Sequence, residues 1–203
     1  MEQFAQYSNP IMTGILRLVN EMMESDTARH ILRTVSYIIT AIKEHVRPYA
    51  PELIRCVSSL WASSVQKQLI QSEIGSYLSI GTSQKHTLTA AIALRTVGII
   101  SALTQALPSE DVAQLDNVLL PLLQMGTDLS NPSSLYLLEE SRDLWYNAMQ
   151  RLGVTPFFVS LLARLSPIYM LEPRKFDHIS SILRIFECYI LLAPPDVVQV
   201  LIY

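Results

Sequence analysis

Apolar residues recur at helical spacing along most of this 203-residue chain, and this periodicity constrains the fold more than any other feature. Ile31, Val35, Ile38 and Ile42 are separated by steps of three or four, which places them on one face of a helix. The sequence contains no Asn-Gly or Asp-Gly hairpin turn, and no segment sustains the apolar–polar alternation of a half-buried strand. The sequence therefore predicts an all-α protein.

The expected helices start at a nearly constant interval. Starts near Pro10, Pro51, Leu115, Pro156 and Asp196 lie 41, 64, 41 and 40 residues apart. Three of these intervals match the ~40–47-residue period of two-helix HEAT-type repeats, which stack side by side into an α-solenoid. We therefore expect residues 1–203 to form a single array of antiparallel helix pairs in a right-handed superhelix, with about four pairs and the start of a fifth. The second helices are expected over about 26–46, 86–106, 133–151 and 174–192.

The 64-residue interval predicts an insertion in the second pair. Its 23 extra residues fit the segment 64–85, which is richer in Ser, Gln and Gly than its neighbours. We expect this segment to be a loop or an irregular short helix outside the regular stack. The final residues VVQVLIY stop in the middle of an apolar pattern, so we interpret the chain as a piece of a longer array.

Composition excludes several classes of protein. Half of the residues are hydrophobic and 16% are charged, which is not the composition of a disordered chain. The net charge of −3 and the scattered Lys and Arg residues give no support for direct nucleic-acid binding. No apolar stretch reaches the ~18 residues of a membrane-spanning helix, and the N-terminus lacks the pattern of a signal peptide, so we expect an intracellular, soluble protein without membrane insertion.

The motifs of catalysis and of metal or cofactor binding are not found. The two cysteines and four histidines have no metal-ligand spacing. Gly75 and Gly81 lack the Lys-Ser/Thr of a phosphate loop, and no Gly-x-Ser-x-Gly segment is present. We therefore expect no enzyme activity, no catalytic residue, no metal and no cofactor.

One group of polar residues is a candidate partner-binding surface. On a helix that starts near Pro132, the inward stripe is expected to be Leu135, Leu138, Trp145, Met149 and Leu152, and the other side is expected to carry Glu139, Glu140, Asp143 and Asn147. A solvated helix face is the first interpretation of these acids, and a protein-binding surface is the second. Arg142 is expected to pair with Glu139 at i+3. Catalysis is disfavoured because no cleft is indicated.

The stretch LPLLQMGTDLSNPSSLYLLEESRDLW, residues Leu120 to Trp145, adds a more specific signal. It resembles the importin-beta (karyopherin-beta) superfamily, and within it the importin-eleven branch. The resemblance rests on the LP-x-L first helix, the TDLSNP turn, the YLLEE start of the second helix and the following LW. A weaker likeness covers PYAPELIRCVSSLW.

This resemblance implies a fragment from the later HEAT repeats of a nuclear import receptor. Such receptors carry protein cargo through the nuclear pore, bind phenylalanine-glycine nucleoporins and the GTP form of Ran, and shuttle between nucleus and cytoplasm. Their second helices line the concave side, where Glu139, Glu140, Asp143 and Asn147 would meet basic cargo. A general HEAT scaffold of the phosphatase or vesicle-coat type and a helical enzyme domain remain as alternatives.

Overall fold

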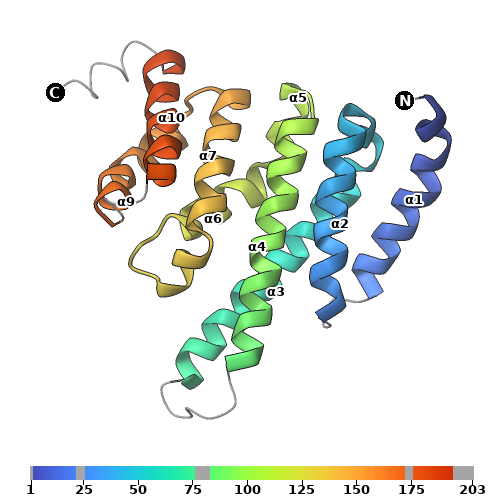
Figure 1. Cartoon of the computed structure of the whole chain (residues 1–203), viewed down its shortest axis with the longest axis horizontal. Coiled ribbons are helices and arrows are strands. Elements are labelled where there is room, and N and C mark those ends of the chain that lie inside the picture. Colours follow the sequence, from blue (N-terminus) through green and yellow to red (C-terminus); the bar gives the residue numbers. More distant parts are fainter. Residues whose placement is uncertain (1, 22–25, 76–82, 172–175, 194–203) are drawn as a thin grey trace. The chain divides into compact units, whose positions relative to one another are not determined.

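The computed structural model describes residues 2–21, 26–75, 83–171 and 176–193, and these residues contain helices and turns but no strand (Figure 1). The chain divides into two compact units, which we call unit 1 (Met1–Pro108) and unit 2 (Ser109–Tyr203). Each unit consists of helix pairs packed side by side. The predicted all-α, HEAT-like class of fold is therefore confirmed.

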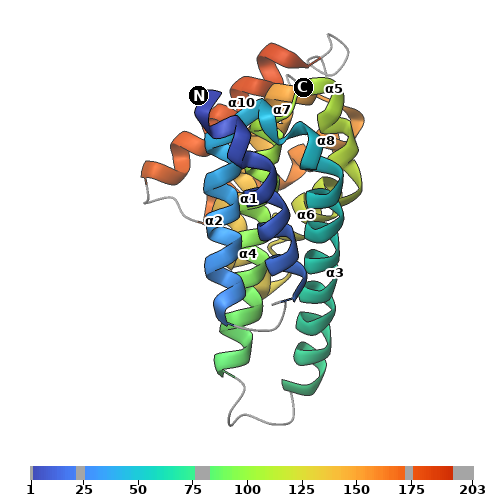
Figure 2. The same cartoon turned by 90° about the vertical axis from the view of Figure 1, so that its right-hand side faces the viewer.

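The described residues of unit 1 form four long helices. They are α1 (Glu2–Glu21), α2 (Asp26–Ile42), α3 (Ala50–Gly75) and α4 (Ser83–Ala106), with the 3-10 helix η1 (Lys43–Tyr49) between α2 and α3. α4 packs along both α2 and α3, and α1 contacts α2 and α3. Figure 2, seen from the α1 end, shows α2 and α3 on opposite sides of α1. The core between these helices is aliphatic and includes Val35, Ile39, Val97 and Leu103.

Local sequence explains why α2 stops at Ile42. Lys43 has a φ of 51°, a left-handed conformation that ends a helix. Pro48 follows within η1; it has no N–H group to donate, and its ring crowds the carbonyl of Glu44. A 3-10 helix with tighter turns therefore forms in place of a further α-helical segment.

Unit 2 is built from shorter elements. Its first helices are interrupted, and in chain order the elements are α5 (Ser109–Val112), η2 (Ala113–Leu115), α6 (Asp116–Gly126), η3 (Pro132–Tyr136), α7 (Leu138–Leu152), α8 (Pro156–Leu161), η4 (Leu162–Arg164), α9 (Leu165–Leu171) and α10 (Phe176–Leu192). α7 packs against α10 on one side and against α6 on another. In the core the ring of Trp145 meets that of Tyr189 edge to face, with 6.2 Å between ring centroids. The Tyr189 hydroxyl donates a hydrogen bond to the Phe158 carbonyl, which ties α10 to α8.

The four second helices lie close to their predicted ranges. α2, α4, α7 and α10 correspond to the segments expected over 26–46, 86–106, 133–151 and 174–192. The starts predicted at Pro51 and Pro156 are also confirmed. The start predicted at Pro10 is wrong, because α1 begins at Glu2 and contains Pro10 in its interior. The start predicted near Asp196 lies outside the described residues.

The expected conformation of segment 64–85 is also wrong where the structure describes it. Residues 64–75 continue α3 without interruption, and 83–85 are the first residues of α4. Leu60 and Ser64, four residues apart, are both buried, so the buried side of α3 continues into the start of this segment despite its polar composition. Residues 76–82 lie outside the described part. The extra length therefore extends both helices of the α3–α4 pair.

Candidate functional site

The candidate surface lies on α7, and the turn before α7 fixes where that helix begins. Asp128 accepts hydrogen bonds from the backbone N–H and the hydroxyl of Ser130, at 3.0 and 2.7 Å. These bonds hold the pKa of the Asp128 carboxyl below its usual range. The buried Ser134 hydroxyl donates to the Asn131 carbonyl at 2.7 Å. The TDLSNPSS segment is therefore a turn closed by its own side chains.

A close approach between α6 and α7 fixes the position of α7 further. A Cβ atom added at Gly126 would lie 2.0 Å from the Ser141 hydroxyl oxygen and 2.9 Å from its Cβ. Only glycine fits here against the buried Ser141. The Arg164 guanidinium of η4 donates to the Gln124 carbonyl and, at 3.2 Å, to the Thr127 hydroxyl. A cation placed on the last carbonyls of α6 is favourable at a helix C-terminus.

The four predicted site residues all lie on α7. We call Glu139, Glu140, Asp143 and Asn147 the α7 acidic face. Glu139 and Asp143 are exposed, whereas Glu140 and Asn147 are half-buried. Their placement away from the buried Leu138, Trp145 and Met149 agrees with the helical period.

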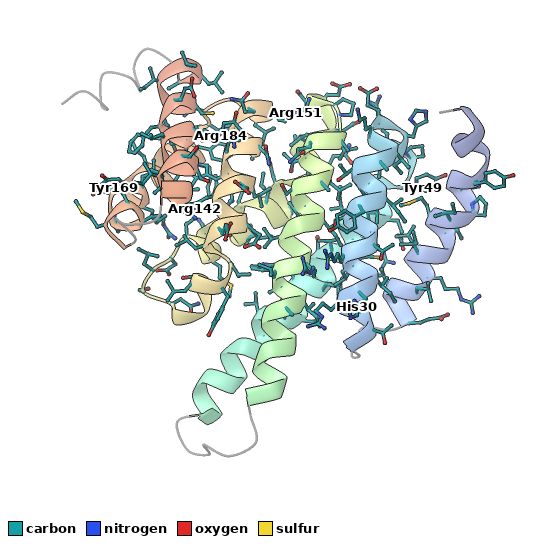
Figure 3. The ribbon with its side chains drawn as sticks, in the orientation of Figure 1. His30, Tyr49, Arg142, Arg151, Tyr169 and Arg184 are labelled. Atoms are coloured by element: carbon teal, nitrogen blue, oxygen red, sulfur yellow. The ribbon has the colours of Figure 1, made fainter. Side chains whose placement is uncertain are left out.

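Asp143 has the most distinctive electrostatic environment of the four. Partial burial raises the pKa of its carboxyl, the charge of Glu139 raises it further, and Arg184 and Arg142 act in the opposite direction. Arg184 comes from α10 (Figure 3). Its guanidinium carbon lies 3.9 Å from the centroid of the Tyr146 ring. The α7 acidic face is thus bordered by a cation that is held on an aromatic ring.

Arg142, which was expected to pair with Glu139 at i+3, lies deeper in unit 2 than its charge suggests. Arg142 is 2% exposed, whereas Glu139 is exposed. The reason is positional: Arg142 is four residues after Leu138 and three before Trp145, so it belongs to the buried stripe. Its charge acts on Asp143 from inside the unit.

Leu135 was expected in the inward stripe and is instead 51% exposed. It lies in η3, where about three residues make a turn, so its direction is out of phase with α7. Tyr136 beside it is 72% exposed. Sequence analysis missed this apolar pair, and also missed the contact of Arg184 with Tyr146, because both depend on how the elements meet.

The described residues show no site for metal chemistry. Among them no group of three or more His, Cys, Asp or Glu side chains is placed to hold a metal ion. Cys56 and Cys188 are buried thiols that form no disulfide. Burial raises the pKa of Cys188, whose sulfur accepts a hydrogen bond from the Gln150 amide at 3.1 Å. In the described ranges, none of the helices combines the length and the apolar character that a membrane-spanning segment needs.

Comparison with known proteins then places the chain in a family. The family model described as "Importin-11-like, TPR repeats" matches residues 95–202, more than half of the chain. The chain belongs to the importin-11-like family. Importin-11 of Mus musculus is 27% identical and importin-11 of Homo sapiens 26% identical, each over 199 residues. No solved structure matches the chain significantly.

Membership of the importin-11-like family confirms the resemblance based on Leu120–Trp145, which lies within the matched residues. The two importin-11 relatives are aligned over 98% of this chain, but the chain spans only 18% of their length. The family description names TPR repeats, and TPR and HEAT repeats are both helix hairpins stacked in a row. The starts of the two first helices of unit 2, Ser109 of α5 and Pro156 of α8, are 47 residues apart, which matches the longer, HEAT-type period.

Proposed function

We propose that this chain is part of a non-enzymatic nuclear import receptor and that the α7 acidic face binds basic protein cargo. The observation that carries the proposal is the family membership together with three adjacent carboxylates on one second helix. In this proposal α7 lies on the concave side of the receptor, where cargo approaches. The receptor shuttles between nucleus and cytoplasm through the nuclear pore, and other parts of it bind Ran-GTP and phenylalanine-glycine nucleoporins.

Charge supports a basic partner for this part of the chain. Unit 2 contains six Lys and Arg residues and eleven Asp and Glu residues, a net charge of −5. At Asp143, burial and the charge of Glu139 outweigh Arg184 and Arg142, since the pKa of its carboxyl is raised. A cargo Lys or Arg beside Asp143 and Glu139 would stabilise the ionised carboxylates. Binding is therefore favoured for Lys- and Arg-rich segments.

The magnitude of this contribution is limited. Exposed ion pairs contribute only ~0.2–1 kcal/mol each, and salt screens them. The α7 acidic face therefore tunes the affinity and the association rate, and apolar contacts must supply the rest. The exposed Leu135 and Tyr136, which lie in η3 shortly before α7, provide apolar surface near the start of the same helix.

The test compares two triple variants of the intact receptor. In the first, Glu139, Glu140 and Asp143 are replaced by Ser; in the matched control, the exposed Glu110, Asp116 and Glu187 of unit 2 are replaced by Ser. Both lose the same charge, so a general charge effect would appear in both. We expect a several-fold loss of affinity for a Lys/Arg-rich cargo peptide in the first variant only, at low salt, with unchanged helical content.

The dependence on salt separates this proposal from a structural effect. The loss should disappear at about 1 M salt, where the screening length falls to ~3 Å. An equal loss in both variants, or a loss that salt does not change, would contradict the role of the α7 acidic face. Membership of the family would stand in either case.

A further inference from the structure

The exposed arginines of unit 1 differ in what they contact. Arg17 and Arg55 lie on the first helices α1 and α3, and each donates to a glutamate of its own helix, at 2.7 and 3.0 Å. On the second helix α2, the Nε–H of Arg33 donates to the Tyr37 hydroxyl at 3.1 Å. Arg33 forms no ion pair with another described residue, so its charge is not balanced locally.

Arg33 belongs to a row of residues along α2. Arg29, Arg33 and Tyr37 are four residues apart, which places them on one side of the helix with a rise of about 6 Å between neighbours, and we call them the α2 arginine stripe. Arg33 and Tyr37 are exposed and Arg29 is half-buried. The buried Val35 and Ile39 point away from the stripe, into the core of unit 1. The α2 arginine stripe is therefore the solvent-facing side of this helix.

The Tyr37 ring holds the Arg33 guanidinium in place. The guanidinium carbon lies 5.5 Å from the ring centroid, within the range of a cation–π contact. Because Nε–H is bonded to the Tyr37 hydroxyl, the two terminal NH2 groups remain to donate, and together they match the two oxygens of a carboxylate. A guanidinium that is already fixed loses less conformational entropy when a carboxylate binds.

The second helices of unit 1 contain almost no acidic residues. α2 and α4 pack along each other (Figure 1), and together they contain four Lys or Arg residues and one acidic residue, Asp26, at the first position of α2. The second helices of unit 2, α7 and α10, contain three Arg and five acidic residues. The charge of the second helices is therefore positive in unit 1 and negative in unit 2. A surface of positive charge favours a partner of negative charge.

We propose that the α2 arginine stripe binds an acidic segment of a partner protein. Carboxylates of the segment accept hydrogen bonds from Arg29 and Arg33, and the Tyr37 ring provides apolar surface beside them. Alternate residues of an extended segment are ~7 Å apart, close to the ~6 Å between Arg29 and Arg33 along the helix, so Asp or Glu at every second position matches the stripe. This surface lies in a different unit from the α7 acidic face and selects partners of the opposite charge.

Binding of a synthetic peptide tests this proposal. The probe is a short fluorescent peptide with Glu at every second position, and its affinity for the intact polypeptide is measured by fluorescence anisotropy at low salt. We expect Arg29→Gln combined with Arg33→Gln to weaken binding several-fold. The matched control, Arg17→Gln combined with Arg55→Gln, removes the same charge from unit 1 and should leave the affinity nearly unchanged.

The single variant Arg33→Lys separates recognition by the guanidinium from a general effect of charge. It keeps the positive charge and loses the planar pair of donors, so it should also weaken binding, with an unchanged melting temperature. Equal losses in the two double variants, or full affinity in Arg33→Lys, would overturn the proposal. Tighter binding of a single-stranded RNA oligonucleotide than of the peptide, lost with Arg29 and Arg33, would overturn it as well and assign the α2 arginine stripe to nucleic acid.

Discussion

Unit 1 and unit 2 use the same helix-pair plan with different backbones. In unit 1 the pair α3–α4 consists of continuous helices of 26 and 24 residues. In unit 2 both first helices are interrupted, by η2 between α5 and α6 and by η4 between α8 and α9. Charge differs too: unit 1 contains nine Lys and Arg against seven Asp and Glu, a net +2, whereas unit 2 has a net −5.

Proline explains one of these interruptions. Pro167 in α9 has no N–H group for the carbonyl four residues earlier, at Ala163, and Ala163 lies within η4. The 3-10 turn changes the direction of the side chains around it, and one of them is Arg164, whose guanidinium reaches the end of α6. A local break in a helix can thus serve packing between neighbouring helix pairs. Where their side chains are described, the long helices of unit 1 bury mainly aliphatic residues, such as Ile39, Leu53 and Val97.

The largest expected effect concerns the aromatic core of unit 2. Trp145→Ala removes a fully buried ring that packs on Tyr189 and should lower the free energy of unfolding by about 3–5 kcal/mol. Hydrogen exchange should show faster opening of α7 and α10 with little change in α2 and α4. Faster exchange throughout unit 1 would show that the two units unfold as one, and would remove the basis of the comparison.

Replacing two helical glycines by alanine should change stability by smaller amounts and in opposite directions. Gly126→Ala forces a Cβ into Ser141 and should cost about 1–3 kcal/mol. Gly98→Ala in α4 meets nothing within 4 Å and should stabilise unit 1 by about 0.5–1 kcal/mol. Thermal unfolding of both variants measures the two shifts. If both variants were destabilised, the close contact between α6 and α7 would not explain why Gly126 differs from Gly98.

The smallest effect is a difference in pH dependence between two acids of unit 2. The pKa of Asp128 is lowered by its bonds from Ser130, so its ionised form stabilises the fold above the unfolded pKa, and this stability is lost as the pH falls through the folded pKa. The pKa of Asp143 is raised by burial, so its ionised form lowers stability at neutral pH, and this cost disappears in acid.

Matched amide variants measure this difference. At neutral pH, Asp128→Asn should lower the unfolding temperature and Asp143→Asn should raise it slightly. Both differences from wild type should shrink as the pH falls through the folded-state pKa of each carboxyl, that of Asp143 first, and vanish once both carboxyls are protonated. Shifts of the same sign at neutral pH would contradict the assigned environments.

The helical period predicted much of the fold and part of the site. It placed the four second helices, and it placed Glu139 and Asp143 on the exposed side of α7. The helical period also places Arg142, four residues after Leu138, on the buried side of α7, whereas its charge suggested an exposed position. The expected burial of Leu135 was wrong for a different reason: the apolar spacing of a sequence does not show where a 3-10 helix gives way to an α-helix.

Features that depend on a second element were beyond single-sequence reasoning. The contact of Arg184 with Tyr146, and the fit of Gly126 against Ser141, join residues from different helices. No local pattern specifies which helix faces meet. Composition was also misleading for 64–85, because α3 continues to Gly75 through a segment of polar composition.

The two tryptophans divide between the units in a way that is useful for spectroscopy. Trp61 is buried in α3 of unit 1, and Trp145 is buried in α7 of unit 2. Replacing either one by Phe leaves a single indole, so the fluorescence of the remaining tryptophan reports on one unit alone. Each half of the chain therefore carries its own intrinsic optical probe, and the order in which the halves melt can be read without any attached dye.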